Sequence, residues 1–495
     1  MHCCLIGFVL AALAAPVPKT WEAKELASLE LPRPGLKEPP VHISAEFYYR
    51  IPVMPIYKSY PIYAPGRGPE DYLEWLRKQE PSIVFDAARL RTDEDWRRAG
   101  ELVFDAPVGY ENDLALEIVS LAMVRDRVWY RESGVPVTRE GIMPFARYVV
   151  RRKGAVEVGN AACGMCHTRV MPDGSLVKGA QGNFPFDRTL AFRARGTVAD
   201  RLILKFLYLA PWARPDTMEP ATLTDMQIYA LQDSIPPGVL ARHGTSLVSP
   251  VQIPDLIGIA NRRYLDRTGL VRHRNIGDLM RYAALNQAAD DFTDYGGFMP
   301  VKLFSPSLPD PAKLDTAKIG LQRARYSDEQ LYALARYLYS LQPPANPNLP
   351  DELSSRGRQI FEREGCAGCH TPPLYTNNRL TPAPGFTIPP AHKRDYDVME
   401  VSAGTDPTLA LRTRRGTGYY KVPSLLGVWY RGPFEHNGSV ATLEDWFDAA
   451  RLRQDYVPTA WKGNGVKTRA VKGHEFGLNL SPVDKKALIA FLRTL

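Results

Sequence analysis

Two copies of one short cysteine pattern constrain the fold of this chain more than any other feature. The first copy is CGMCH at residues 163–167, and the second is CAGCH at residues 366–370. In Cys-x-x-Cys-His, two thiols add to the two vinyl groups of one porphyrin, and the adjacent histidine reaches the iron as proximal ligand. Two such matches arise by chance with odds on the order of 10⁻⁶. The sequence therefore predicts two covalently bound c-type haems. The residues predicted to hold them are Cys163, Cys166, His167, Cys366, Cys369 and His370.

Other uses of the four cysteines explain less of the pattern. Two Cys-x-x-Cys pairs can bind one zinc ion, but these pairs are far apart in the chain and each carries the additional histidine. A thioredoxin-like redox pair would be a single Cys-x-x-Cys in a βαβ setting, which the sequence lacks. Two disulfides closing such short loops would leave the histidines unexplained. We therefore expect haem at both patterns.

An apolar run near the N-terminus predicts an export signal. The run over residues 5–15 is too short to span a bilayer, but it has the length of the apolar region of a secretory signal. Ala12-Leu13-Ala14 supplies a small-x-small cleavage pattern, so residues 1–15 are predicted to be a signal peptide. A buried N-terminal segment is the alternative. Covalent haem is attached outside the cytoplasm, so we expect an exported, periplasmic protein. No later stretch is apolar enough for a membrane span.

The composition suits a globular chain with several domains. The 495 residues are 45% hydrophobic and 23% charged, and at roughly 150 residues per domain this length favours two to four domains. The formal net charge of +8 is a mild basic excess. No basic run or aromatic-basic module stands out, so nucleic acid is not an expected partner. A basic rim that meets an acidic redox partner fits this charge.

Helix-start signals surround both cysteine patterns. Thr92 begins a capping-box pattern with an acidic residue three positions later, and Ser327 begins another with a glutamine. Ser481, followed by proline, predicts the start of the final helix. A faint repeat links GELVF at 100–104 to GRQIF at 357–361. The repeat indicates a duplicated unit with an entry helix, a haem pattern, a loop region and a closing helix.

These signals predict a mainly α protein of two cytochrome c-like haem domains in tandem, with a loop-rich N-terminal extension. The predicted boundaries are 16–150 for the extension, 151–342 for the first haem domain and 351–495 for the second. A proline-rich stretch at 342–350 is the expected linker. Residues 16–91, rich in proline and tyrosine, are expected to form an extended arm packed on the body, with partial disorder as the alternative. Strand signals are few and short.

The second half of the chain resembles a known family. GTGYYKVPSLLGVWYRGPFEHNGSVATLEDWF at 416–447 is similar to the C-terminal haem domain of the bacterial di-haem cytochrome c peroxidase/MauG superfamily. The long extension, the segment 404–425 and GHEFGL at 473–478 look closer to its rubber-oxygenase-like branch. The resemblance implies that the N-terminal haem meets peroxide or oxygen, and that the C-terminal haem relays electrons and has two protein ligands.

The resemblance also bears on the sixth ligand of the second haem. His436 matches a histidine that the family places near that haem. The compact peroxidases place a methionine ligand further on, but this position is Ala450, followed by Arg451. His474 is the predicted sixth ligand instead, and bis-histidine ligation would lower the haem potential relative to His/Met. The alternative is that His474 caps or bonds a loop.

The first haem lacks the nearby distal histidine of the compact peroxidases, since no histidine follows His167 until His243. It is therefore expected to be open, or closed by a more distant group. The stretch 253–283 resembles the distal-pocket region of the family, with the inter-haem tryptophan falling on Leu265. The pocket candidates are His273, Met280, Arg281 and Tyr282, and His273, Arg281 and Tyr282 are the predicted catalytic residues. The alternative is a surface role for His273 and Arg281, and a core role for Met280 and Tyr282.

Two functions from different classes remain open at this stage. The first is a peroxidase-like di-haem oxidoreductase that reacts with H₂O₂ or O₂, with a small redox protein as its electron donor. Breaking an O–O bond needs a proton and a positive or hydrogen-bonding group at the leaving oxygen. The second is a di-haem electron-transfer cytochrome without its own substrate. Tyr264, Trp429 and Tyr430 are candidate electron relays. The resemblance also allows calcium between the domains, held largely by backbone oxygens.

Overall fold

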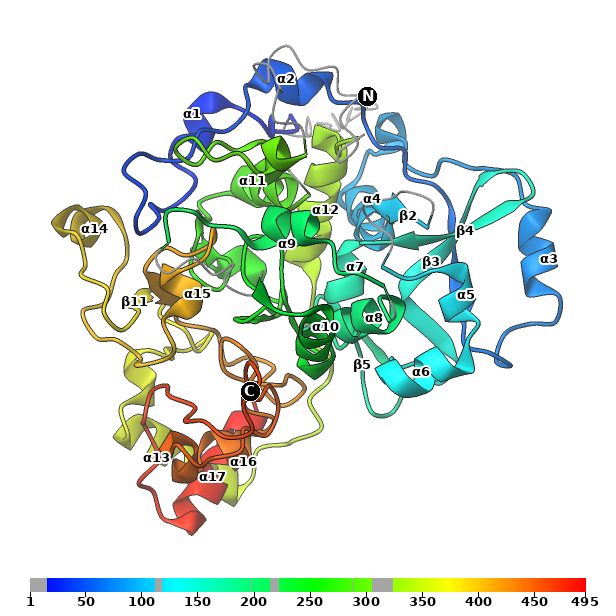
Figure 1. Cartoon of the computed structure of the whole chain (residues 1–495). Helices are drawn as coiled ribbons and strands as arrows, with labels where there is room; N and C mark the ends of the chain where they lie inside the picture. The colour runs from blue at the N-terminus through cyan, green and yellow to red at the C-terminus, as the bar shows by residue number, and fades with distance from the viewer. Residues whose placement is uncertain (1–15, 112–117, 196, 214–221, 288, 305–323) are drawn as a thin grey trace, which may run out of the picture.

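Two crossed helix pairs organise the molecule, and each belongs to one of the two cysteine patterns. The computed structural model describes residues 16–111, 118–195, 197–213, 222–287, 289–304 and 324–495. In Figure 1 the second unit, coloured yellow to red, lies at the lower left, and the blue N-terminal arm runs over the top of the molecule. The predicted signal peptide, residues 1–15, lies outside the described residues.

The first helix pair consists of α4 (Asp93–Asp105) and α12 (Asp328–Ser340). Both begin with the predicted capping boxes, at Thr92 and at Ser327, so these two expectations are confirmed. Gly100 lies where the helices cross, because a Cβ at this position would be 2.0 Å from the carbonyl oxygen of Ala333. Only a glycine allows the two backbones to approach this closely.

The second helix pair repeats this arrangement. It consists of α13 (Glu352–Arg363) and α17 (Pro482–Arg493), and α17 begins at Ser481 with proline in its first turn, as predicted. A Cβ on Gly357 would lie 1.9 Å from the carbonyl oxygen of Ala487. The repeat read from the sequence therefore corresponds to a repeated glycine-centred helix crossing. α4 contributes to the first crossing, although it lies inside the range predicted as extension, 16–150.

A four-stranded sheet departs from the expectation that strands are few and short. Its order is β1-β3-β4-β2, and every pairing is antiparallel. The strands are β1 (Ser59–Tyr63), β2 (Gly109–Tyr110), β3 (Ile142–Arg152) and β4 (Ala155–Asn160). β3 and β4 form a hairpin around Gly154, which has a positive φ of 83°. The mainly α expectation therefore holds only loosely, since a substantial sheet packs with the helices of the first unit.

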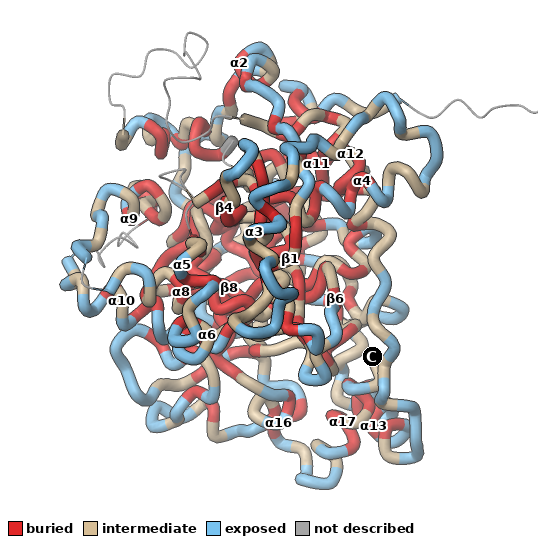
Figure 2. The backbone as a smooth tube through the Cα atoms, turned by 90° about the vertical axis from the view of Figure 1, so that its right-hand side faces the viewer, coloured by how far each residue is buried: buried red, intermediate tan, exposed pale blue. Residues whose placement is uncertain are grey.

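Residues 16–91 pack on the body of the protein, as predicted, rather than following the alternative of partial disorder. Trp21 is 1% exposed and Phe47 is fully buried, and both belong to the core that also contains the helices α4 and α12. The backbone N–H of Leu31 donates to the carbonyl oxygen of Leu270, and Arg33 Nε donates to that of Arg414 at 2.6 Å. The arm thus contacts chain from both halves of the protein. Figure 2 shows buried residues concentrated among α4, α11, α12 and the sheet, with a smaller buried group at α13 and α17.

Short elements connect these parts. The remaining α-helices are α1 (Ala23–Leu26), α2 (Ala45–Arg50), α3 (Tyr72–Arg77), α5 (Leu121–Val124), α6 (Arg127–Ser133), α7 (Cys163–Cys166), α8 (Phe186–Arg193), α9 (Arg201–Tyr208), α10 (Asp225–Ser234), α11 (Ile276–Asn286), α14 (Pro390–Asp395), α15 (Thr408–Leu411) and α16 (Leu443–Trp446). The two-stranded pairs are β5 (Thr168–Val170) with β6 (Leu176–Lys178), β7 (Val239–Leu240) with β8 (Val251–Gln252), β9 (Tyr264–Leu265) with β10 (Val271–Arg272), and β11 (Leu380–Pro382) with β12 (Tyr419–Lys421). Within the described ranges, no helix combines the length and apolar character needed to cross a bilayer.

Candidate haem sites

The first cysteine pattern forms α7, a single helical turn that packs beside α4. His167 follows this turn, and its Nδ1–H donates to the carbonyl oxygen of Pro254 at 3.1 Å. Burial, with the nearby positive charge of Arg242, lowers the pKa of His167 to about 4. The imidazole is therefore neutral at pH 7, with the proton on Nδ1 and the lone pair on Nε2. This is the tautomer that a histidine needs in order to ligate iron.

The second pattern has the same histidine geometry in a more exposed setting. Its cysteines lie on the short turn η8 (Cys366–Gly368), and the Nδ1–H of His370 donates to the carbonyl oxygen of Tyr375 at 3.0 Å. Burial again lowers the pKa of this histidine. Gly164 and Met165 of the first pattern are buried, whereas Gly368 of the second is exposed. In both histidines, a backbone carbonyl fixes the ring through its bond to Nδ1. The other ring nitrogen, Nε2, is thus left as the atom that can ligate a metal.

The four cysteines do not assemble a zinc site. They are free thiols in the structure, and burial raises the pKa of Cys163 to about 12 and that of Cys166 to about 11. Among the described residues, the one cluster with metal-ligand spacing is His243, Asp290 and Asp291, which contains no cysteine. The two Cys-x-x-Cys pairs therefore do not share one metal-ligand cluster in the described part of the chain.

A cavity of about 380 Å³ lies against the second pattern. Its lining is mostly apolar and includes both cysteines, His370 and two further histidines, His436 and His474. The aromatic and aliphatic part of the wall includes Phe361, Tyr420, Leu425, Val428, Phe434, Leu443, Trp446, Phe447, Leu488 and Leu492. An apolar space with two thiols at its wall and histidines facing it has the donor set that a c-type haem requires.

His474, the predicted sixth ligand, lines this cavity together with His370. Its Nδ1 is buried without a hydrogen-bond partner, and its ring packs edge-on against Trp446 with centroids 5.3 Å apart. Burial, followed by the charge of nearby His370, lowers its pKa to about 4. Arg451 donates to the carbonyl oxygen of His474 at 2.7 Å and so fixes the loop that carries it. The side chain thus meets the requirements for a neutral ligand.

His436 faces the same cavity from a different loop. Its Nδ1 contacts Thr405 Oγ1 at 3.0 Å and pairs closely with the Glu435 carboxylate, while Nε2 is buried without a partner. The pKa of Glu435 falls to about 2 despite the opposing effect of burial, because the charge of His436 and several hydrogen bonds stabilise the carboxylate. The second site therefore offers two histidines with an unpartnered nitrogen, of which the sequence prediction chose His474.

The predicted distal residues have separate sets of partners. His273 is held at both ring nitrogens, by the carbonyl oxygen of Arg262 at 2.7 Å and by the hydroxyl of Tyr339 at 2.6 Å. Arg281 is buried, forms an ion pair with Asp278 at 3.2 Å and donates to the carbonyl oxygen of Lys19. Met280 is fully buried in the main core. The bonding partners of His273 and Arg281 are typical of residues that hold the fold together, rather than of residues that face a ligand pocket.

Tyr282 differs, because its partners lie next to the first cysteine pattern. Its hydroxyl donates to Asp266 Oδ2 at 2.9 Å and lies 3.3 Å from the guanidinium of Arg242. Arg242 forms an ion pair with the same Asp266 oxygen at 2.9 Å, and its charge acts on both His167 and Cys166. Of the three predicted catalytic residues, Tyr282 therefore belongs to a charged network beside the first cysteine pattern, and its catalytic role stays a prediction.

Asp187 was missed in the sequence, although it lies in α8 shortly after the first pattern. It is 1% exposed, its Oδ2 accepts the backbone N–H of Ala241 at 3.0 Å, and its Oδ1 has no hydrogen-bond partner. Burial raises its pKa to about 7, and its charge acts on Cys166. A buried acid that holds a proton near neutral pH is a candidate proton donor. No local sequence signal distinguishes such an aspartate from an ordinary surface one.

Tyr430 joins the two units. Its hydroxyl donates to Asp255 Oδ2 at 2.9 Å, next to the Pro254 carbonyl that holds His167, and its ring lies edge-on to Trp429 with centroids 5.1 Å apart. Tyr264 also lies at the junction and donates to Asp397 at 3.2 Å, while Leu265 is buried in β9. Tyr430 thus contacts the residue next to Pro254, whose carbonyl holds His167, and its role as an electron relay stays a prediction.

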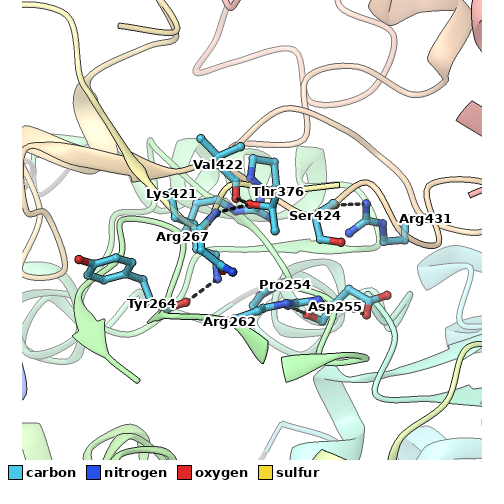
Figure 3. A pocket seen from close by; sticks show the side chains of 12 residues that line it. Pro254, Asp255, Arg262, Tyr264, Arg267, Thr376, Lys421, Val422, Ser424 and Arg431 are labelled. Atoms are coloured by element: carbon cyan, nitrogen blue, oxygen red, sulfur yellow. Dashed lines mark hydrogen bonds and ion pairs between the residues drawn. The ribbon is translucent and has the colours of Figure 1, made fainter. Parts of the chain in front are cut away.

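A second cavity, of about 30 Å³, lies at this junction, and Figure 3 shows the side chains around it. Its lining contains one carboxylate, Asp255, and four basic residues. The basic residues are Arg262, Arg267, Lys421 and Arg431. A divalent cation does not fit this lining, because the basic side chains would repel it. Calcium at this place between the units is therefore not supported by the residues present.

Comparison with known proteins gives a distant peroxidase relative. No family model matches the chain. Cytochrome-c peroxidase IdrP1 from Denitromonas iodatirespirans is 26% identical over 160 residues, which are 29% of this chain and 40% of that protein. The uncharacterized protein y4iM from Sinorhizobium fredii is 28% identical over 166 residues, 28% of this chain and 35% of that one. The chain thus spans less than half the length of either relative.

Two solved structures are also similar, at low scores. Kuenenia stuttgartiensis hydrazine synthase, pressurised with xenon, has a TM-score of 0.29 and 14% identity, covering 62% of this chain and 92% of that one. A MauG-like protein associated with microbial copper homeostasis has a TM-score of 0.31 and 17% identity, covering 61% and 90%. The sequence relationship to a cytochrome-c peroxidase is consistent with the resemblance seen in residues 416–447, while the rubber-oxygenase-like branch stays a prediction.

Proposed function

We propose that this protein is an exported di-haem c-type oxidoreductase of the cytochrome c peroxidase kind. In this proposal the first haem reacts with H₂O₂ or O₂, and the second relays electrons from an external redox protein. The observation that carries the proposal is the matched pair of histidines, His167 and His370. Each follows a Cys-x-x-Cys turn, donates Nδ1–H to a backbone carbonyl and is held neutral by burial. Such a pair suits two iron centres in one chain.

The two sites are proposed to have different coordination. At the second site, His370 and His474 would hold the iron of a bound haem, and an iron with two protein ligands would supply electron transfer rather than substrate binding. Among the described residues, the two histidines that have a buried nitrogen without a hydrogen-bond partner are His436 and His474, and both line the cavity of the second site rather than the first. When bound there, a haem supplies an iron that can bind and reduce peroxide. The chain's own task is then to orient the bound oxygen, supply protons and exclude competing ligands.

Asp187 and Arg242 are the residues best suited to that task. Asp187 carries a proton near neutral pH and has a free buried oxygen, so it can deliver a proton to the leaving oxygen. The guanidinium of Arg242, oriented by Asp266 and Tyr282, supplies a fixed positive charge next to the same cysteine turn. Preorganised positive charge of this kind stabilises developing negative charge on oxygen. Tyr282 is a positioning residue in this scheme.

Electrons would pass from the second unit to the first through the junction around Tyr430. Its hydroxyl donates to Asp255, one residue after the Pro254 carbonyl that orients His167, and the residue that follows it, Arg431, lines the cavity beside His370. The exposed second pattern is the natural entry point for an external donor, because Gly365 and Gly368 leave the attachment turn open to solvent. A basic rim on the whole protein, with a net charge of +8, would favour an acidic donor.

Low-temperature EPR on the as-isolated ferric protein, before and after one equivalent of H₂O₂, tests this function. The expected result is one high-spin and one low-spin signal, with the high-spin signal lost on peroxide addition and a new high-valent or radical signal appearing. A high-spin signal that ignores peroxide would point to oxygen or another ligand. Two low-spin signals unaffected by peroxide, in both resting and half-reduced protein, would favour the electron-transfer cytochrome instead.

A further inference from the structure

Three basic residues, called the basic wall below, line both of the cavities described above. Arg267, Lys421 and Arg431 line the large cavity beside His370, and the same three residues line the small cavity at the junction of the units. Figure 3 shows that these side chains come from two distant stretches of chain, 254–267 and 376–431, which meet at this place. The wall is therefore built jointly by the two halves of the protein.

These three cations have no anionic partner. Arg267 donates to the side-chain oxygen of Gln252, Lys421 Nζ lies 3.5 Å from the carbonyl oxygen of Tyr264, and Arg431 donates to that of Ser424 at 2.8 Å. The Nε atoms of Arg267 and Arg431 are buried without any hydrogen-bond partner. Within the described part of the chain, no carboxylate lies within ion-pair distance of any of the three. Their bonds are all to neutral oxygen atoms.

The carboxylates nearby already have other partners. Those partners are Arg242 and Arg415 for Asp266, His436 and Thr405 for Glu435, and Tyr430 for Asp255. An unpaired charge that is removed from water is unfavourable. In keeping with this, burial and the neighbouring arginines lower the pKa of Lys421 well below its ordinary value and that of Arg267 to about 10. The three side chains thus form a positively charged wall that an anion with more than one negative charge would stabilise.

We infer that Arg267, Lys421 and Arg431 hold the two propionate carboxylates of the second haem. The inference rests on the proposed function, since it requires a haem attached at Cys366 and Cys369. A haem joins an apolar ring to two carboxylates on one edge, and the large cavity joins an apolar body to this basic wall. Two carboxylates would neutralise most of the excess charge, and charge-assisted hydrogen bonds to guanidinium are the strongest available.

The inference has a structural consequence, because Arg267 belongs to the half of the chain that carries the first pattern. It lies between β9 and β10, whereas Lys421 ends β12 and Arg431 follows Tyr430. The second haem would therefore be held by both halves, and its propionates would close the junction between them. The haem would act as part of the interface as well as a redox centre.

Resonance Raman spectroscopy and redox titration of the holoprotein test the inference directly. Arg267→Gln should shift the propionate bending band of the second haem and lower its midpoint potential more than that of the first. A propionate left without its cation favours the ferric state by its negative charge. The conservative change Arg267→Lys should restore most of both values. Arg263→Gln is the matched control, because Arg263 is exposed and pairs with Asp397 at 3.0 Å, so neither value should move.

A second test uses the sign of a stability change. In the holoprotein Lys421→Gln should lower the melting temperature, because it removes a partner of the propionates. In a Cys366→Ala/Cys369→Ala chain, shown by pyridine haemochrome to hold one haem, the same change should raise the melting temperature by removing an unpaired buried charge. Equal signs in the two backgrounds would overturn the inference. If the cysteine variant does not fold, the Raman band and potential of the holoprotein decide the question.

The remaining outcomes distinguish a failure of this inference from a failure of the proposed function on which it rests. A saturable rise in the melting temperature of the holoprotein with inorganic phosphate, together with an unmoved propionate band in Arg267→Gln, would mean that the wall binds a free anion, and would overturn the inference. Absence of haem on the peptide that contains Cys366, measured by mass spectrometry of the wild-type protein, would instead overturn the proposed function. An unmoved band in a protein that does carry this haem contradicts the inference alone.

Discussion

The two units that carry the cysteine patterns share one frame and differ in what covers it. Each has a pair of helices crossing at a glycine, Gly100 or Gly357, and a histidine held by a backbone carbonyl. The first pattern is covered by the arm, the sheet and the helices around α12, and its Gly164 and Met165 are buried. The second opens toward solvent at Gly365 and Gly368. Under the proposed function, the frame would set where each haem attaches, while the covering would set what can reach it.

The largest expected effect comes from removing one attachment site at a time. Cys163→Ala/Cys166→Ala and Cys366→Ala/Cys369→Ala should each lose one of two haems, because each pair holds its own porphyrin. Loss of the first should abolish reaction with peroxide, whereas loss of the second should abolish reduction by an external donor and leave a peroxide-sensitive first haem. Pyridine haemochrome and mass spectrometry give the stoichiometry. A variant that keeps two haems, or loses both, would break the comparison.

The next effect concerns the ligands of the second haem. His474→Ala should convert this haem from low-spin to high-spin in the ferric EPR spectrum, because it removes the sixth ligand. His436→Ala is the matched control from the same cavity and should leave the haem low-spin while altering its potential. If the two results are exchanged, the buried Nε2 of His436 is the ligand, and the assignment of His474 is wrong.

A smaller effect is expected at the first site from Asp187→Asn. The change should lower the rate of peroxide reaction by about 10²-fold, the usual contribution of a placed proton donor. Its pKa is raised from 3.8 to about 7, so the folded state binds this proton more tightly than the unfolded state does. The folded state therefore loses stability as the pH rises from 3.8 to about 7.

Asp187→Asn should remove this pH-dependent loss, so the variant should melt at a higher temperature than the wild type at pH 8 and show a flatter pH profile of peroxide reaction. Asp233→Asn serves as its control, because that aspartate lies at the end of α10 and is exposed. A peroxide rate that Asp187→Asn leaves unchanged, at any pH, would remove Asp187 from the proposed mechanism.

The last prediction concerns stability rather than activity, and it tests the shared frame itself. Gly100→Ala and Gly357→Ala should each destabilise the protein by about 3 kcal/mol, since the new methyl group would lie 2.0 Å and 1.9 Å from backbone oxygens. The gain in helix propensity, about 1 kcal/mol, is too small to offset this clash. Gly368→Ala has open space around it and should change the free energy of unfolding by less than about 0.5 kcal/mol. Chemical denaturation measures all three.

The sequence predicted the parts of the fold that depend on local patterns. The capping boxes at Thr92 and Ser327, the start at Ser481 and the glycine-phenylalanine repeat all appear as expected, because each is set by residues within one helical turn. The sheet was missed because the β3–β4 hairpin is marked only by a Lys-Gly turn. The carbonyl partners of His167 and His370 could not be predicted, since backbone oxygens have no residue signature.

The residues of the candidate sites also fall into two groups, those that a local sequence pattern predicts and those that it does not. Attachment residues follow from a contiguous pattern, whereas Asp187, Arg242 and the unpaired cations Arg267 and Lys421 acquire meaning only through burial and neighbours from distant chain segments. His273 and Arg281 were chosen by alignment to a resemblance, and their partners Tyr339 and Asp278 are invisible to such an alignment.

The helix crossings also bear on the order in which the chain folds. α4 and α12 close a much longer stretch of chain than α13 and α17 do. Closing a longer loop costs more chain entropy, and contacts between residues distant in sequence slow folding. Once both of its helices have been synthesised, the C-terminal crossing is therefore expected to form faster than the N-terminal crossing does. Its helices are nevertheless the last ones to be made. Until α12 docks on α4, the thiols of the first pattern remain accessible to the machinery that attaches haem.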